Sequence, residues 1–405
     1  MGSPAVWAPW AASSSRGSPG TSRVGSGCRS QSLRSLAGSG CWSLRRPSHD
    51  CGKGPAPRAD RERRYRPSVD PPSSPPLPPT DTTLVVTGAN GQLGRALQTA
   101  LSARSHGPVR ALVRSERARR AVEALELDPA PEIRIVDYTS PSAMEAALAG
   151  AHFVIHLVGI IKEMPGTRYV EAHEQTCHAL ALAASRAGIE RIVYLSILGS
   201  APDSDNPCLA SKGRAETLLL DDRVAATVLR VPMVIGGDDP ASASLRKQAQ
   251  AGSVRLVAGG RTLQQPIDAR DVIRAILAAC SAEPGRDLLL DAAGPECLSH
   301  RNLVLRAARL YGNEPKIRSL PAGLARLGVA CVEKLLPNPP ITRAMFDILQ
   351  HDDRADPEAF CQKLGIELTS LDTTLTDFVG PGSDSRTRAG AIARNVPPAG
   401  QGRES

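Results

Sequence analysis

Three glycines after an apolar run carry the clearest chemical signal in the chain. Residues 83–86 lead into Thr87, Gly88, Ala89, Asn90, Gly91, Gln92, Leu93 and Gly94, so the spacing is G-x-x-G-x-x-G. A turn that reverses sharply and brings its backbone close to a ligand favours residues without Cβ. A helix that begins here directs free amides and a positive dipole end toward phosphates. The pattern predicts a dinucleotide held over 87–94; a tight turn without a ligand is the alternative.

Two arginines bear on which dinucleotide is bound. An acidic residue after the second apolar run would accept hydrogen bonds from an adenosine 2′-hydroxyl. The chain instead has Arg114 there, and Arg95 follows the last glycine. One such arginine offers a 2′-phosphate charge-assisted hydrogen bonds worth roughly 1.5–3 kcal/mol. We therefore expect NADP(H), with NAD(H) and a solvated Arg114 as the alternative.

Apolar runs alternate with helical periodicity between residues 81 and 236. Strands are expected at 83–86, 109–113, 133–136, 153–159, 191–199 and 226–236. Helices are expected after residue 92, where leucines repeat every four residues, and over 167–187, ending at Gly188. The apolar runs lack alternation, which is typical of parallel strands buried on both faces. The order predicts an α/β fold with a Rossmann-type doubly wound parallel sheet.

The strand ends supply further candidate residues, because ligands bind at the carboxyl ends of such strands. Asp137 and Tyr138 end the third strand and are expected to line the adenine. Val158 and Gly159 end the fourth strand and are expected near the ribose beside the nicotinamide.

After residue 236 the pattern becomes irregular and predicts a smaller C-terminal lobe, from about 237 to 379. Its expected elements are strands at 254–257 and 288–291 and helices at 269–282, 300–310 and 322–335. Asp268, Arg270 and Asp271 are expected to cap and flank the first of these helices. The helix at 322–335 carries Leu324, Leu327, Val332, Leu335 and Leu336. Core packing is the default for them, and docking to a membrane-bound partner is the alternative.

Composition separates the two ends from the folded part, whose 41% hydrophobic content allows a sizeable core. Residues 1–80 hold 12 Lys or Arg against 4 Asp or Glu, while the remainder balances at 37 of each. This Ser-, Gly-, Pro- and Arg-rich leader is expected to be disordered, as a transit peptide or a start assigned too early. Residues 380–405 are expected to form a disordered tail. A neutral folded part argues against nucleic-acid binding.

Cysteines and histidines predict no metal site. The nine cysteines include no C-x-x-C pair, so a reducing compartment is the simpler interpretation. His156 is expected in the core, and His173 and His178 are poorly spaced to share a metal. No uncharged apolar run approaches the ~18–20 residues that span a bilayer.

These residues resemble the short-chain dehydrogenase/reductase superfamily, in its extended or atypical branch. The chain is more closely similar to the family of the nucleotide-binding accessory subunit of respiratory complex I and its bacterial relatives. The resemblance covers about 82–378 and rests on TGANGQLG (from Thr87), FVIHLVGI (from Phe153), RIVYLSILGS (from Arg191), ASKGRAE (from Ala210), TVLRVPMVIG (from Thr227), QPIDARDVIRAI (from Gln265) and AAGPECLSHRNLV (from Ala292). Pro232, within the fifth segment, is a further expected cofactor contact.

The resemblance also implies catalytic positions. In active members a Tyr four residues before a Lys moves the substrate proton, a Ser assists, and the Lys holds the nicotinamide ribose. Lys212 matches the Lys and Ser196 the Ser, but the tyrosine position is Cys208. A thiol is much shorter than a phenol, so Cys208 is expected to be a small buried residue, with a reactive thiol as the alternative. Tyr194 lies deeper on the strand of Ser196 and is a poor substitute.

The resemblance favours an NAD(P)H-binding structural or assembly factor linked to respiratory complex I, with little or no catalysis. The alternative is an NADP-dependent reductase or epimerase acting on a carbonyl or nucleotide-sugar substrate; an RNA-binding relative is least favoured. Expected partners are the dinucleotide and membrane respiratory complex subunits. The expected location is the cytoplasm or the periphery of a bacterial respiratory membrane, or the mitochondrial matrix if the leader is a transit peptide.

Overall fold

The computed structural model describes residues 78–79, 81–220, 223–237, 239–283 and 285–382. Our expectations for the leader up to residue 77, and for the tail from residue 383, lie outside these ranges. Within them, no helix combines the length and the apolar character needed to cross a bilayer.

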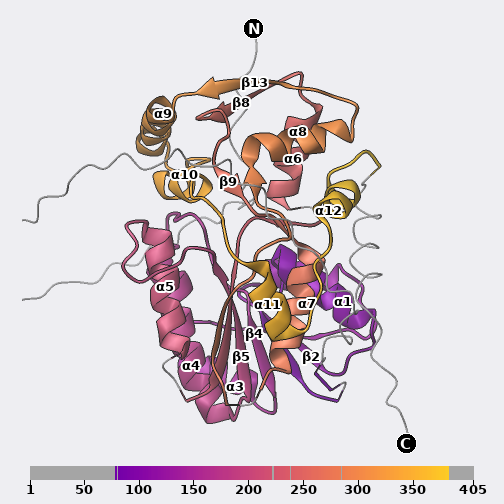
Figure 1. Ribbon diagram of the computed structural model, residues 1–405. Helices are drawn as coiled ribbons and strands as arrows, with labels where there is room; N and C mark the ends of the chain where they lie inside the picture. The colour runs from indigo at the N-terminus through magenta and orange to yellow at the C-terminus, as the bar shows by residue number, and fades with distance from the viewer. Residues whose placement is uncertain (1–77, 80, 221–222, 238, 284, 383–405) are drawn as a thin grey trace, which may run out of the picture. The chain divides into compact units, whose positions relative to one another are not determined.

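A seven-stranded sheet in the order β11-β6-β5-β4-β1-β2-β3 holds the structure together (Figure 1). All neighbouring strands are parallel. The chain leaves β1 toward β2 and β3 and then returns to β4 on the other side of β1, so a ligand crevice is expected at the carboxyl ends of β1 and β4. The strands are β1 (Leu84–Thr87), β2 (Val109–Val113), β3 (Glu132–Ile135), β4 (Phe153–His156), β5 (Arg191–Ile197), β6 (Ala225–Val231) and β11 (Leu288–Asp291). The predicted fold class is confirmed.

Helices cover both faces of the sheet, which explains the uniformly apolar strands. Leu84 and Val86 point into one core cluster and Val85 into the other, as the period of two along a strand requires. The first cluster includes residues of α1 (Gln92–Ser102), α2 (Glu116–Glu123) and α7 (Ala269–Cys280). The second includes residues of α3 (Pro141–Leu148), α4 (Thr176–Ala187) and α5 (Pro207–Leu220).

Several elements differ from their expected bounds. The strand expected at 153–159 leaves the sheet after His156. The strand expected at 226–236 is split, because Pro232 has no N–H for the ladder, and β7 (Val234–Ile235) follows separately. The helix expected at 167–187 begins with a π-helix, η1 (Val170–Gln175), before α4. It ends at Gly188 with φ 70°, as predicted.

The strand at 288–291 was expected in the irregular C-terminal part, and this expectation is wrong. This segment is β11, and it pairs in parallel with β6 at the edge of the main sheet. Helix α7 likewise packs against β5 and β6 rather than within a separate lobe. A parallel pairing between strands far apart in sequence leaves no local turn signal, so the pattern alone could not place β11.

The remaining elements lie beyond the carboxyl ends of the main sheet and around α7 (Figure 1). β8 (Ser253–Val257) pairs with β13 (Lys316–Leu320), β9 (Leu263–Gln264) with β12 (Leu298–Ser299), and β7 with β10 (Ile267–Asp268). The helices are α6 (Pro240–Gln250), α8 (His300–Arg309), α9 (Ala322–Leu335), α10 (Arg343–Leu349), α11 (Pro357–Leu364) and α12 (Leu371–Phe378).

Core packing was the wrong expectation for the leucines of α9. The exposed fractions are 63% for Leu324, 62% for Leu327, 78% for Leu335 and 47% for Leu336. The helix buries Ala325 and Val329 instead.

Arg270 forms a buried ion pair at the start of α7 and a second ion pair with α12. Asp268 caps α7 by accepting from the amide of Arg270, as predicted. The guanidinium of Arg270 donates to both carboxylate oxygens of Asp268 and to Asp377, at 2.7–2.9 Å. It also lies 4.9 Å from the ring centroid of Phe378. Asp271 is buried separately and accepts from the amide and hydroxyl of Thr369. These contacts fasten the C-terminal helices to the sheet layer.

We expect Arg270→Ala to lower the free energy of unfolding by about 3–5 kcal/mol, because it leaves the Asp268 carboxylate buried without its counter-charge. Arg286→Ala is the matched control, since Arg286 pairs with Glu283 on the surface and should contribute less than about 1 kcal/mol. Denaturant titrations followed by circular dichroism would measure both. Similar small losses in the two variants would contradict a structural role for the buried pair.

Candidate functional site

The glycine turn packs β1, α1 and the end of β4 tightly together. Gly88 has φ +67°, and a Cβ there would lie 3.2 Å from the carbonyl group of Leu157. A Cβ on Gly94 would lie 2.6 Å from the carbonyl oxygen of Gly88 and 2.8 Å from that of Ala89. Neither position can take a side chain without moving backbone, so both glycines are needed for this close approach.

The start of α1 fits an anionic group. The helix begins at Gln92, with Gly91 as its N-cap and no side-chain cap hydrogen bond, so its first amides remain available for a ligand. Asn90 and Gly91 are exposed. The buried Nε of Arg95, one turn further on, has no hydrogen-bond partner among the described residues. An uncapped helix start beside an orphaned guanidinium nitrogen suits a diphosphate or phosphate.

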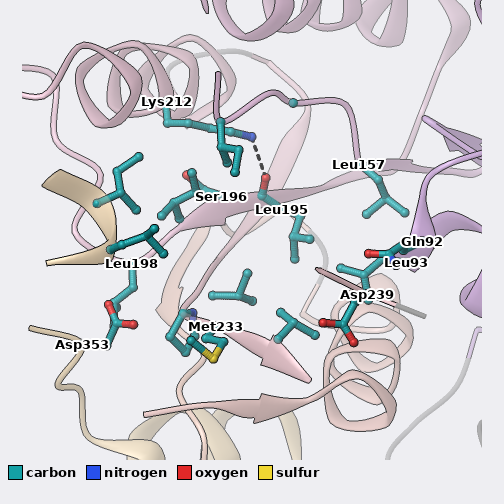
Figure 2. A pocket seen from close by; sticks show the side chains of 18 of the residues that line it. Gln92, Leu93, Leu157, Leu195, Ser196, Leu198, Lys212, Met233, Asp239 and Asp353 are labelled. Atoms are coloured by element: carbon teal, nitrogen blue, oxygen red, sulfur yellow. Dashed lines mark hydrogen bonds between the residues drawn. The ribbon is translucent and has the colours of Figure 1, made fainter. Parts of the chain in front are cut away.

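A cavity of about 260 Å³ opens beside this turn. Figure 2 shows it between the ends of the main strands and the C-terminal segments. The cavity wall is mostly apolar and includes Met345, Ile348 and Leu349 from α10. Six predicted site residues lie in this wall, namely Gln92, Leu93, Gly159, Ser196, Lys212 and Pro232.

Lys212 reaches the cavity from α5. Its Nζ donates to the carbonyl oxygen of Leu195 at 3.0 Å (Figure 2) and lies 4.4 Å from the ring centroid of Tyr194. Gly159 makes room for it, because a Cβ at 159 would lie 2.9 Å from Nζ. Burial lowers the pKa of Lys212. Ser196 also borders the cavity, and its Oγ donates to Ser200 Oγ at 3.3 Å.

Cys208 stands one helical turn before Lys212 but is not part of the cavity wall. The residue is fully buried, and its Sγ donates to the carbonyl oxygen of Ile160 at 3.5 Å. Burial raises the pKa of the thiol to about 12. The thiol is therefore buried, as expected of a small core residue, and it is protonated at neutral pH.

Other predicted residues surround the turn without lining the cavity. Arg114 is exposed after β2, next to Ser115, the N-cap of α2. Asp137 is exposed and accepts from the amide and hydroxyl of Thr139, at 2.9 and 2.7 Å. The buried Tyr138 hydroxyl donates to the carbonyl oxygen of Leu112 and accepts from the amide of Gly88 at 3.1 Å. Tyr138 thus braces the glycine turn, a role that its position at a strand end did not indicate.

Thr87 and His156 are buried at the ends of the neighbouring strands β1 and β4. Val158 is buried. His156 is a core histidine, as predicted, with Nδ1 2.8 Å from Thr87 Oγ1, and burial lowers its pKa to about 3. His173 is buried while His178 is exposed, so they face different surroundings. The described residues include no group of three side chains arranged to hold a metal.

Sequence reasoning missed three charged residues of the cavity wall, Asp239, His351 and Asp353. Asp239 caps α6, and its position directly before Pro240 is a helix-start signal that could have drawn attention to it. His351 and Asp353 follow α10 and had no local signal, because only the tertiary fold brings them to the strand ends. Burial raises the pKa of both Asp239 and Asp353.

Comparison with known proteins identifies the domain. Residues 88–282 match the family described as NAD(P)H-binding. The domain at residues 88–282 is therefore of the NAD(P)H-binding type. The chain is 28% identical, over 197 residues, to "NADH dehydrogenase [ubiquinone] 1 alpha subcomplex subunit 9, mitochondrial" of Arabidopsis thaliana. That match covers 47% of the chain and 48% of the relative, so the chain spans about half the length of this relative.

Two further comparisons support the assignment. The chain is 27% identical over 308 residues to "4-hydroxy-2-methyl-3-oxo-4-farnesyl-3,4-dihydroquinoline-1-oxide ketoreductase" of Stigmatella aurantiaca, covering 67% of the chain and 90% of the relative. It shares its fold with UDP-glucose 4-epimerase from Bifidobacterium longum in complex with NAD+ and UDP, with a TM-score of 0.56 and 15% identity over 74% of this chain and 97% of that one. The resemblance inferred from the motifs is confirmed.

We expect Cys208 to resist alkylation in the folded protein. With a pKa of about 12, its thiolate fraction at pH 8 is about one part in ten thousand. Cys331 is exposed on α9 and serves as the control that reacts first. Timed labelling with iodoacetamide, followed by peptide mass spectrometry, would distinguish the two. If Cys208 were labelled as fast as Cys331, the burial of Cys208 would be contradicted and the alternative of a reactive thiol would be supported.

Proposed function

We propose that this protein binds NADP(H) mainly as a structural ligand, in association with respiratory complex I, and catalyses little or no turnover. The observation that carries the proposal is Cys208. A positioned acid or base contributes about 10²–10⁴ in rate, and the residue at the expected acid position is a buried, protonated thiol outside the cavity. Lys212 and Ser196 border the cavity without that acid.

A bound dinucleotide would stabilise the fold even without chemistry. The turn over 87–94 and Arg95 would hold its phosphates, and Lys212 would hold the nicotinamide ribose. A ligand that binds only the folded state adds about 2.7 kcal/mol of stability at one hundred times its Kd. The link to complex I is supported by the 28% identity to a subunit of the mitochondrial enzyme. It would place the protein in the mitochondrial matrix or at a bacterial respiratory membrane.

The preference for NADP(H) is supported by the arginines around the turn. Arg114 is exposed where the 2′-substituent of the adenosine is expected, and it forms no ion pair with any residue that the structure describes. Arg95 contributes a buried guanidinium nitrogen that has no partner there. Both positive groups favour a 2′-phosphate over a 2′-hydroxyl.

A second candidate function is reduction of an apolar carbonyl compound. It is favoured by the mostly apolar cavity that ends at Ser196 and Lys212 and by the similarity to a ketoreductase. When bound, NADPH would supply a hydride to the carbonyl carbon, and the oxygen would take its proton from solvent water. Ser196 would donate a hydrogen bond to the carbonyl oxygen, and the apolar wall would exclude water from the remainder of the substrate.

We expect Arg114→Asp to weaken NADPH binding by about tenfold or more, since an arginine–phosphate contact is worth roughly 1.5–3 kcal/mol, while NADH binding changes little. Arg120→Asp, an exposed arginine on α2, is the matched control. Calorimetric titration of both cofactors into each variant gives the comparison. Equal losses of affinity for NADPH and NADH would show that Arg114 does not determine the preference for NADPH.

The two functions differ in what Cys208→Tyr does. We expect purified protein to retain bound NADP(H) and to show no turnover on a panel of apolar ketones and nucleotide sugars. Cys208→Tyr should then create activity, by about a hundredfold over background, and Lys212→Ala should abolish the gain. Cys208→Ala and thermal melts control for folding at this buried position. Turnover by the unaltered protein that is lost in Lys212→Ala would establish the reductase instead.

A further inference from the structure

Helix α9 exposes a continuous apolar stripe. Leu324, Leu327, Cys331 and Leu335 recur at helical spacing, so they share one face. The three leucines are 62–78% exposed, and Cys331 is exposed as well. Soluble surfaces carry isolated apolar residues, but a run of leucines along three turns marks an interaction site.

The opposite face of α9 fixes the direction of this stripe. Ala325 and Val329 pack with Ile341, Met345 and Phe346 in a separate core cluster. The cluster also takes Val257 from the end of β8, and Leu320 from the end of β13 packs against it. The helix therefore lies beside α10 and the ends of β8 and β13 (Figure 1). Its leucines are exposed, so they lie on the part of the helix that this cluster does not cover.

A basic face adjoins the stripe. β8 and β13 are parallel, with Arg255 directly opposite Arg318, and Lys316 lies two residues before Arg318. All three are exposed, and none forms an ion pair with a described residue. The alternation of a strand places them on the face that ends in Val257 and Leu320, where α9 packs. Neighbouring like charges repel each other, and an anionic partner would relieve this repulsion.

The acidic groups of α9 and α10 that form ion pairs are already neutralised. Glu333 of α9 pairs with Arg343 at 2.9 Å, and Asp347 of α10 pairs with Arg326 at 3.2 Å. The net character of the surface is thus an apolar stripe flanked by positive charge, which is the pattern of helices that lie in the plane of a membrane interface.

We propose that this docking surface, made of Leu324, Leu327, Cys331 and Leu335 with Arg255, Lys316 and Arg318, binds an anionic lipid bilayer. The leucines enter the headgroup and acyl boundary, and the basic residues contact lipid phosphates. α9 would lie parallel to the membrane, with α10 behind it. Because Met345 belongs both to the cluster under α9 and to the cavity wall, the bound membrane would lie next to the apolar cavity.

Flotation of the full chain with vesicles tests the proposal. Vesicles of phosphatidylcholine alone are compared with vesicles that also contain phosphatidylglycerol. We expect binding to the anionic vesicles only. Leu327→Ser/Leu335→Ser should reduce the partition coefficient at least tenfold, since burial of a leucine is worth about 1.5–3 kcal/mol. Arg255→Gln/Arg318→Gln should reduce it by about fivefold for each arginine.

Matched controls separate the docking surface from other basic or apolar sites. Leu289→Ser removes an exposed leucine of the edge strand β11, and Arg120→Gln removes an exposed arginine of α2; neither should change binding. The basic segment 1–80 is present in every variant, so it cannot produce the differences. NADPH titration of each variant reports cofactor binding independently of the membrane.

Three results would overturn the proposal. One is wild-type binding by the double leucine variant, which would place the lipid contact elsewhere. Another is equal binding to neutral and anionic vesicles that the arginine substitutions do not change. The third is a wild-type chain that is dimeric by light scattering and binds neither kind of vesicle, together with a leucine variant that is monomeric. The stripe would then be the contact between two copies of the chain.

Discussion

The close approach of β1, α1 and the end of β4 is the constraint on which the site depends. Gly94 allows backbone to meet backbone at a distance that no Cβ would permit, and Gly88 combines a tight approach with a positive φ that disfavours other residues. Tyr138 then ties the turn to β2 by accepting from the amide of Gly88. This contact sets where α1 begins, and therefore where its uncapped amides point. The cavity opens beside this turn, with Gln92 and Leu93 of α1 in its wall.

Lys212 and Cys208 lie on the same helix, but only Lys212 borders the cavity. Lys212 keeps a position beside the cavity because it is held by the carbonyl oxygen of Leu195 and by the ring of Tyr194. Cys208, on the same helix, turns its thiol to Ile160 and stays protonated. The features that we propose to hold a dinucleotide are therefore present together, whereas a packing residue stands at the position expected for the proton donor. This contrast favours a binding role over a catalytic one.

The C-terminal segments complete the cavity and carry a surface of their own. α10 supplies the apolar wall on one side, and the same helix supports α9 on the other. Arg270, which is paired with Asp268 at the start of α7, anchors α12 through a second ion pair with Asp377. The region is thus built onto the nucleotide-binding sheet, while its outer helix leaves four leucines uncovered.

Local pattern determined much of this protein. The turn over 87–94, the apolar strands, the stop at Gly188, the cap at Asp268 and the core position of His156 could all be predicted, because each depends on neighbouring residues or on a repeat along the chain. Tertiary structure alone decided the rest. β11 joins β6 through a parallel pairing without a local turn, and His351 and Asp353 reach the cavity from a distant segment. The leucines of α9 show the same limit, since helical spacing reveals an apolar face but not whether another element covers it.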